Sequence, residues 1–261
     1  MLLAAWMYRG FIFTSIKNEF KSRFARSKIG GVWMVLNPLL QVLMYALVLS
    51  AVLSVKLPGI DDQFAYSIYL TAGFLAWGLF SEIVLKCLTI FIDNGNLMKK
   101  MVFPKICLPL IIVGSVLVNN VLLLVAIIAI FALLGHYPGF SALWLPVLFV
   151  VPIVFGLGLG LIIGVLNVFL RDVGQVVPVM LQFGFWFTPI IYTPNIIPEA
   201  YRDWLVFNPM YHVTSAFQNI LVFGKAPEWF ELGIVTLISV ALLALAFFIF
   251  RRASAEMVDV L

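Results

Sequence analysis

Six long runs of apolar residues constrain this chain more than any other feature of its sequence. A helix rises about 1.5 Å per residue and needs about 20 apolar residues to cross a bilayer. In lipid every backbone amide must be paired internally, and the runs lack the alternation of barrel strands, so helices are expected. The predicted fold is therefore an all-α polytopic membrane protein. Its six transmembrane helices are expected near Val32–Val55, Tyr66–Phe91, Ile106–Leu134, Leu143–Leu170, Val173–Ile191 and Phe230–Phe250.

Charged residues are scarce and unevenly placed. They make up 11% of the chain, against about 25% in soluble domains. Twelve cations fall before the first run, after the second and fourth, and in the tail, whereas Lys56, Arg202 and Lys225 fall on the opposite side. Cytoplasmic loops carry an excess of Lys and Arg. We therefore expect both termini in the cytoplasm, a transmembrane domain over residues 31–252 and a cytoplasmic tail over 253–261.

The first 30 residues are too charged to span and are predicted to form an amphipathic interface helix. Apolar side chains recur every three or four residues at Phe13, Ile16, Phe20 and Phe24, and the lysines lie off this stripe. Such helices lie in the headgroup layer with one face buried. A simple membrane anchor and a lever that passes force from a cytoplasmic partner are both consistent with this pattern.

The segment after the fifth run is apolar but broken. Pro194, Pro198 and Pro209 divide it into pieces too short to cross a bilayer. We therefore expect a hairpin of re-entrant short helices over residues 194–225, or else a lid packed on the helix bundle.

Charged and small residues inside the runs are predicted to serve structure. Glu82 and Lys86 lie four residues apart and share one helical face. A snorkelling pair near the cytoplasmic interface is favoured over an ion pathway. Gly156, Gly160 and Gly164 recur every four residues, which predicts close packing between helices.

Aromatic side chains gather on one face of the fifth run. Phe183, Trp186 and Phe187 recur at three- and four-residue spacing, and Tyr192 adds a polar tip nearby. Aromatic faces stack on the apolar faces of sugars, so this wall would let a neutral sugar chain slide past. Ordinary helix packing or lipid contact is the alternative for each residue.

No phosphate-binding loop occurs in the sequence. Gly224 and Lys225 are followed by Ala226 rather than Ser or Thr, and the upstream glycine is missing. With only two histidines, a histidine-based metal site is not expected either. If ATP drives this protein, another chain must bind the nucleotide.

Four sequence blocks are more specific than these features. They are RFARSKIGGVWMVLNPL at 23–39, NGNLMKKMVFPK at 94–105, Arg171-Asp172 followed by FTPI at 187–190, and NPMYH at 208–212. In this order and spacing the chain resembles the ABC-2 type permeases that export polysaccharides. Among them it is most similar to the O-antigen, capsule and teichoic acid exporter permeases, and most of all to O-antigen permeases.

The resemblance implies a six-helix subunit in the bacterial cytoplasmic (inner) membrane. It implies a homodimer around a central channel, paired with two copies of a separate ABC ATPase. The cargo would be a glycan linked to undecaprenyl diphosphate. The chain would be no enzyme by itself and would bind no cofactor, because ATP and Mg would be bound by the partner ATPase.

The resemblance also implies roles for individual residues. The channel-lining aromatics would be Trp33, Tyr45, Phe183, Trp186, Phe187 and Tyr192. The coupling loop, residues 93–105, would contact the ATPase through Asn96, Lys99, Lys100, Phe103, Pro104 and Lys105. The external gate would include Pro194, Pro198, Asn208, Pro209 and Tyr211.

Three cations beside the interface helix, Arg23, Arg26 and Lys28, are candidates for binding the lipid diphosphate. Arg and Lys pair well with phosphates. Positive-inside anchoring is the simpler account of the same residues.

Three other function classes stay open at this point. One is an ABC-2 exporter of teichoic acid, capsule, a small lipid or a drug. Another is a membrane scaffold that transports nothing. The last is a membrane-embedded glycan transferase or ligase, whose chemistry needs acids, His or Arg that converge in a loop. The segment after the fifth run offers Glu199, Arg202, Asp203 and His212 for that purpose.

Overall fold

The fold is built from helices, as the apolar runs predict. This computed structural model describes residues 6–23, 32–45, 65–95, 99, 106–133, 135–137 and 139–260. The elements in chain order are α2 (Arg9–Arg23), α3 (Trp33–Tyr45), α4 (Ala65–Asp93), α6 (Cys107–Leu133), η3 (Phe140–Trp144), α7 (Leu145–Phe169), α8 (Val173–Phe187), η4 (Pro194–Ile196), α9 (Glu199–Arg202), η5 (Asp203–Phe207), α10 (Pro209–Leu221) and α11 (Trp229–Val260).

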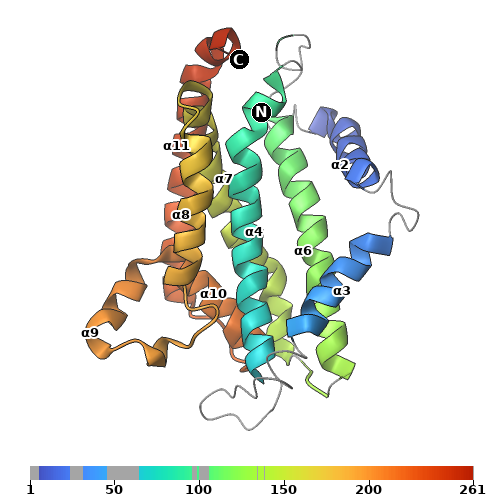
Figure 1. The fold of residues 1–261 in the computed structure, drawn as a ribbon, viewed down its shortest axis with the longest axis vertical. Coiled ribbons are helices and arrows are strands. Elements are labelled where there is room, and N and C mark those ends of the chain that lie inside the picture. The colour runs from blue at the N-terminus through green and yellow to red at the C-terminus, as the bar shows by residue number, and fades with distance from the viewer. Residues whose placement is uncertain are drawn as a thin grey trace.

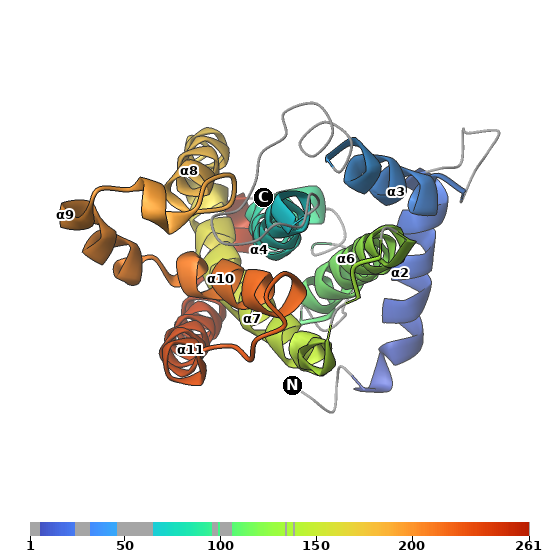
Figure 2. The same cartoon turned by 90° about the horizontal axis from the view of Figure 1, so that it is seen from below.

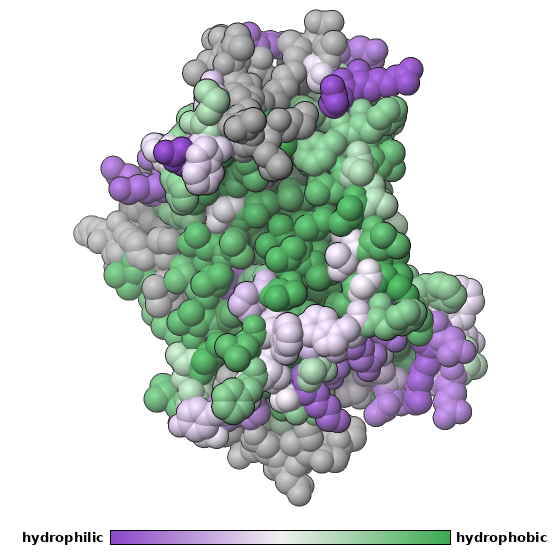
Figure 3. Space-filling model, turned by 180° about the vertical axis from the view of Figure 1, so that it is seen from behind, coloured by the Kyte–Doolittle hydropathy of each residue, from purple (hydrophilic) through white to green (hydrophobic). Residues whose placement is uncertain are grey.

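Among the described residues, four helical stretches are long and apolar enough to cross a membrane. They are Ala65–Asp93, Cys107–Leu133, Phe140–Phe169 and Trp229–Ser254. They match the predicted second, third, fourth and sixth spans. Figure 3 shows a broad apolar band over the middle of one face, with hydrophilic side chains toward both ends. The chain is therefore a multi-pass all-α membrane protein, and the count of six spans stays a prediction.

Three predicted boundaries differ from those of the helices. α8 ends at Phe187 rather than at Ile191, because Pro189 lacks a backbone N–H and restricts Thr188, which is extended with φ −100° and ψ 128°. α11 continues to Val260, so the predicted tail prolongs the last helix. The predicted first span begins as α3, and its part beyond Tyr45 lies outside the described residues.

The core forms where α7 packs between α4 and α11. Two faces of α7 carry glycines at these contacts. An added Cβ at Gly160 would lie 2.8 Å from the Cβ of Cys87 on α4, and one at Gly158 would lie 2.8 Å from the backbone nitrogen of Leu243 on α11. The glycine repeat therefore packs helix against helix, as its four-residue spacing predicts.

The remaining helices surround this core at two ends and along its sides. α2 and the C-terminal end of α11 lie at one end of the molecule, while α9 and α10 lie at the other (Figure 1). α10 packs across the ends of α4 and α7. α3 and α8 lie on either side of α4, as Figure 2 shows from below.

We expect Gly164→Ala to destabilise the fold. The new Cβ would collide with the backbone carbonyl oxygen of Cys87, which cannot rotate away. Overpacking costs about 1–3 kcal/mol, which exceeds the helix preference of Ala over Gly, about 1 kcal/mol. The thermal unfolding midpoint of the purified protein should fall. Gly78→Ala is the matched control, since a Cβ at Gly78 in α4 meets open space. Equal midpoints for both variants would contradict the proposed contact.

Candidate functional site

One face of α8 is uncovered within the described part of the chain, and it is apolar apart from two exposed glutamines at its border, Gln175 and Gln182. We call this face the α8 stripe: Val176, Val179, Met180, Phe183, Trp186 and Phe187. The three aromatic side chains are 58%, 57% and 71% exposed. The opposite face packs on α4, where the ring of Phe185 lies 5.3 Å from that of Phe74 and 6.0 Å from that of Trp77. α8 is therefore held from one side only.

The structure brings together part of the aromatic set predicted to line a channel. Phe183, Trp186 and Phe187 lie on the α8 stripe. Tyr192 lies just beyond it and donates a hydrogen bond from its hydroxyl to the Trp186 carbonyl oxygen, at 2.8 Å. Trp33 is half-buried at the start of α3, across α4 from α8. Tyr45 is also predicted to line the channel, but its side chain lies outside the described part of the chain.

The segment that follows α8 is fixed to α4 and α10. The Tyr69 hydroxyl on α4 lies 3.2 Å from the carbonyl oxygen of Pro189 and 3.3 Å from that of Tyr192. The side-chain amide of Gln218 on α10 donates to the same Pro189 oxygen at 3.2 Å. Gly73 permits this approach, because a Cβ there would meet Ile190 at 2.9 Å. The end of α8 is thereby linked to the start of α4.

The predicted gate residues define the start of the short helices. Asn208 is the N-cap of α10: its side-chain oxygen accepts from the Met210 backbone nitrogen at 3.0 Å, and its amide donates to the Thr188 hydroxyl at 2.9 Å. Pro209 occupies the first helical position, where its missing N–H costs nothing. Pro194 begins η4 and Pro198 precedes α9.

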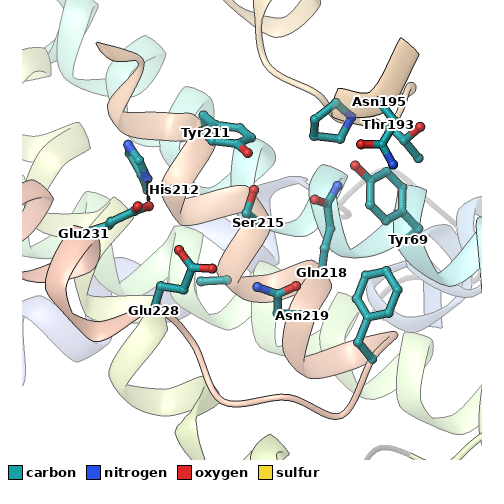
Figure 4. A pocket seen from close by; sticks show the side chains of 13 residues that line it. Tyr69, Thr193, Asn195, Tyr211, His212, Ser215, Gln218, Asn219, Glu228 and Glu231 are labelled. Atoms are coloured by element: carbon teal, nitrogen blue, oxygen red, sulfur yellow. Dashed lines mark hydrogen bonds and ion pairs between the residues drawn. The ribbon is translucent and has the colours of Figure 1, made fainter. Parts of the chain in front are cut away.

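A polar cavity of about 270 Å³ lies beside α10 (Figure 4). Its walls come from α10, the first turns of α4, the segment at 193–195 and the start of α11. We call it the α10 pocket, and the predicted gate residue Tyr211 lines it. Burial, and then the carboxylates of Glu231 and Glu228, raise the pKa of the Tyr211 phenol, so it stays protonated at neutral pH.

A polar contact at the opposite end joins α2 to α4 and α6. Lys86 on α4 donates to the Glu19 carboxylate of α2 at 2.6 Å and to the Ser115 hydroxyl of α6 at 3.1 Å. The predicted partner Glu82 lies farther from Lys86, at 3.7 Å. The Glu82 carboxylate also accepts a hydrogen bond from the side-chain amide of Asn119 on α6, at 3.4 Å. Sequence reasoning found the pair with Glu82 and missed Glu19, although Glu19 is the one acid in the first 30 residues.

The same helices enclose a cleft of about 570 Å³ near the predicted coupling loop. Ser15, Asn18 and Ser22 of α2 face Thr89 and Asp93 of α4 across it. In the loop itself Lys99 is exposed. The other predicted coupling residues, Asn96, Lys100, Phe103, Pro104 and Lys105, lie outside the described residues, as do Arg26, Lys28 and the side chain of Arg23.

Two of the four residues offered for transferase chemistry, Arg202 and His212, are engaged in local structure. Arg202 donates to the carbonyl oxygens of Ile197 at 2.9 Å and Asn195 at 3.0 Å, which closes the loop before α9. His212 pairs through Nδ1 with Glu231, and its Nε2 lies 2.8 Å from the Val206 carbonyl oxygen. Within the described ranges, no cluster of three His, Cys, Asp or Glu side chains has the geometry to hold a metal.

Comparison with known proteins gives the family. Residues 11–222 match the ABC-2 type transporter family. The chain is 28% identical to the O-antigen export system permease protein RfbA of Myxococcus xanthus, over 97% of this chain and 96% of that protein. It is 29% identical to a protein of the same name from Klebsiella pneumoniae over 79% and 78%. It is 21% identical to the polysialic acid transport protein KpsM of Escherichia coli over 92% of each chain.

The family match spans most of the chain, from α2 to the end of α10. It confirms the resemblance carried by the four sequence blocks, all of which lie within the matched residues. The chain belongs to the ABC-2 type transporter family.

Proposed function

We propose that this chain is the membrane-spanning permease subunit of an ATP-driven exporter. Its cargo would be an undecaprenyl-diphosphate-linked polysaccharide, of the O-antigen type. Two relatives named O-antigen export system permease protein, matched over 79% and 97% of this chain, support a cargo of the O-antigen type. The geometric observation that carries the proposal is the α8 stripe. Its open aromatic rings offer weak, repeated contacts to the apolar faces of sugar rings, with no charged side chain among its six residues.

A second copy of the chain would complete the path. The α8 stripe is uncovered in the described part of the chain, and a stripe of this kind needs lipid or protein beside it. Two copies that face each other through α8 and α3 would enclose a passage. Phe183, Trp186 and Phe187 would line it from one helix, and Trp33 and Tyr45 from the other.

The driving force would come from two copies of a separate ABC ATPase, which would bind ATP and Mg. The chain's own lack of a phosphate-binding loop supports this arrangement. Residues 93–105 and α2 would meet that partner at the cytoplasmic face of the inner membrane, with both chain termini on the same side. Arg23, Arg26 and Lys28 would attract the lipid diphosphate there.

Coupling between the two ends of the molecule would run along α4. Near one end, Lys86 binds Glu19 of α2. Near the other, Tyr69 binds the segment after α8. Since a helix transmits displacement along its axis, a shift of α2 would alter the position of the predicted gate.

Replacing Trp186 and Phe187 together by Ala is expected to reduce export about thirtyfold, because two aromatic contacts of about 1 kcal/mol each add to about 2 kcal/mol. The measurement is the amount of surface polysaccharide per cell at equal protein level. Phe248→Ala on α11 is the matched control, since Phe248 is 63% exposed and lies on another helix. Unchanged export by the double variant would remove the α8 stripe from the path.

Replacing Lys86 by Met is expected to separate ATP hydrolysis from export. The variant cannot bind Glu19, so α2 would move without α4. Export should fall by up to about fivefold, because a partly exposed ion pair contributes about 0–1 kcal/mol, while hydrolysis by the complex continues. Glu19→Gln should act in the same direction. Lys21→Met removes an exposed cation of α2 and is the control. Equal losses of hydrolysis and export in Lys86→Met would contradict a coupling role.

Deleting the gene is expected to abolish the surface polysaccharide and to leave its undecaprenyl-linked form inside the cell. Mass spectrometry of extracted lipids measures the second outcome. Loss of teichoic acid or capsule instead would reassign the cargo within the same family. Normal surface polymers would reject polysaccharide export altogether. Transfer of sugar by the purified chain without an ATPase would favour a transferase.

A further inference from the structure

The α10 pocket lies at the end of the molecule opposite α2, next to the segment that follows α8 (Figures 1 and 4). Its volume of about 270 Å³ is near the lower limit for small-molecule sites, about 300 Å³. A site of this size accommodates one ring of a sugar chain rather than a whole lipid. Neither the α8 stripe nor the Glu19–Lys86 contact shares a side chain with it.

The lining combines aromatic rings with hydrogen-bonding groups. The rings are those of Tyr69 on α4, Tyr211 on α10 and Phe223 just after α10. Between them, Ser215 supplies a hydroxyl and Asn219 supplies an amide. Figure 4 shows the polar tips of Tyr211 and Ser215 directed toward the same space. A sugar ring has apolar C–H faces and a rim of hydroxyls, so it needs both kinds of partner.

Part of this lining is fixed and part is available. Gln218 and Tyr69 are held by the Pro189 carbonyl oxygen, and His212 is held by Glu231 and the Val206 carbonyl oxygen. In contrast, no hydrogen bond or ion pair within the described chain engages the side chains of Asn219 and Glu228, although both line the pocket. Fixed walls with unengaged polar groups are the arrangement of a preformed binding site.

The charge of the pocket selects among sugars. Glu228 and Glu231 supply carboxylates, of which Glu231 is paired with His212, and no Lys or Arg is among the lining residues. A phosphate, sialic acid or uronic acid would be repelled there, since like charges without a counterion disfavour binding. A hydroxyl of an uncharged sugar would instead donate to the free Glu228 carboxylate in a charge-assisted hydrogen bond.

We propose that the α10 pocket binds one uncharged sugar unit of the transported chain. This proposal rests on the proposed function, because it takes the cargo to be a glycan. It adds that the glycan segment held at this end of the molecule is neutral. Binding should be weak, in the millimolar range, so that the chain can advance.

The test measures sugar binding to the full chain in lipid nanodiscs free of sugar-based detergents. The probes are the methyl glycosides of glucose, galactose, mannose and N-acetylglucosamine, with methyl glucuronide as the acidic counterpart. Saturation-transfer NMR titrations give the affinities. At least one neutral glycoside should bind, and methyl glucuronide should bind about tenfold more weakly or not at all.

Variants assign the binding to the pocket. Glu228→Ala and Asn219→Ala should each weaken binding about tenfold, the order expected for a hydrogen bond to a charged or buried group. Glu199→Ala is the matched control, because Glu199 is an exposed acid on α9 outside the pocket.

Two results would overturn the proposal: no binding by any neutral glycoside, or binding that survives both lining variants. Methyl glucuronide bound as tightly as the neutral sugars would overturn the charge selection. These outcomes are distinct from failure of the proposed function. If gene deletion abolishes surface polysaccharide while no sugar binds the purified chain, the pocket proposal fails alone. If sugars bind the pocket while deletion leaves all surface polymers normal, the proposed export role fails alone.

Discussion

The close approach of α7 to α4 is the contact on which the other elements depend. At Gly164 the two helices meet backbone to backbone, because the Cys87 carbonyl oxygen occupies the space that a side chain would need. Nearby, the buried Asn167 amide donates to the Leu88 carbonyl oxygen at 2.9 Å. Apolar side chains gain little by leaving lipid for a protein interface, so such packing and interhelical hydrogen bonds hold membrane helices together. α11 joins the same helix on the opposite side at Gly158.

The outer helices α8 and α2 make fewer contacts with the bundle than α4, α7 and α11 do. This difference bears on the proposed function. α8 has no buried residue, and α2 rests on α6 where Ile16 meets Gly114. The Glu19–Lys86 pair is partly exposed, with side-chain exposures of 43% and 27%. Exposed ion pairs contribute about 0–1 kcal/mol. Such a pair sets the position of α2 without locking it, so under the proposed function the binding of the partner ATPase would be able to shift this helix.

Sequence patterns predicted local features well and long-range contacts poorly. The predicted second span differs from α4 by one residue at its start and two at its end, because apolar length is a property of the segment itself. The Asn208-Pro209 start of α10 is likewise local. By contrast, the four-residue rule pointed from Lys86 to Glu82, while the closer partner, Glu19, lies 67 positions away. The α10 pocket was not foreseen either, because its lining comes from four separate segments.

The two ends of the molecule differ in charge, and the proposed cargo differs in the same way along its length. Exposed cations such as Lys17, Arg251 and Arg252 belong to the end formed by α2 and the end of α11, whereas Glu228 and Glu231 line the pocket at the other. A lipid diphosphate would be favoured at the first end and a neutral glycan at the second. Binding alone would then hold the diphosphate where it starts. Under the proposed function, its transfer therefore requires a change of affinity between two conformations, and ATP hydrolysis by the partner would drive that change.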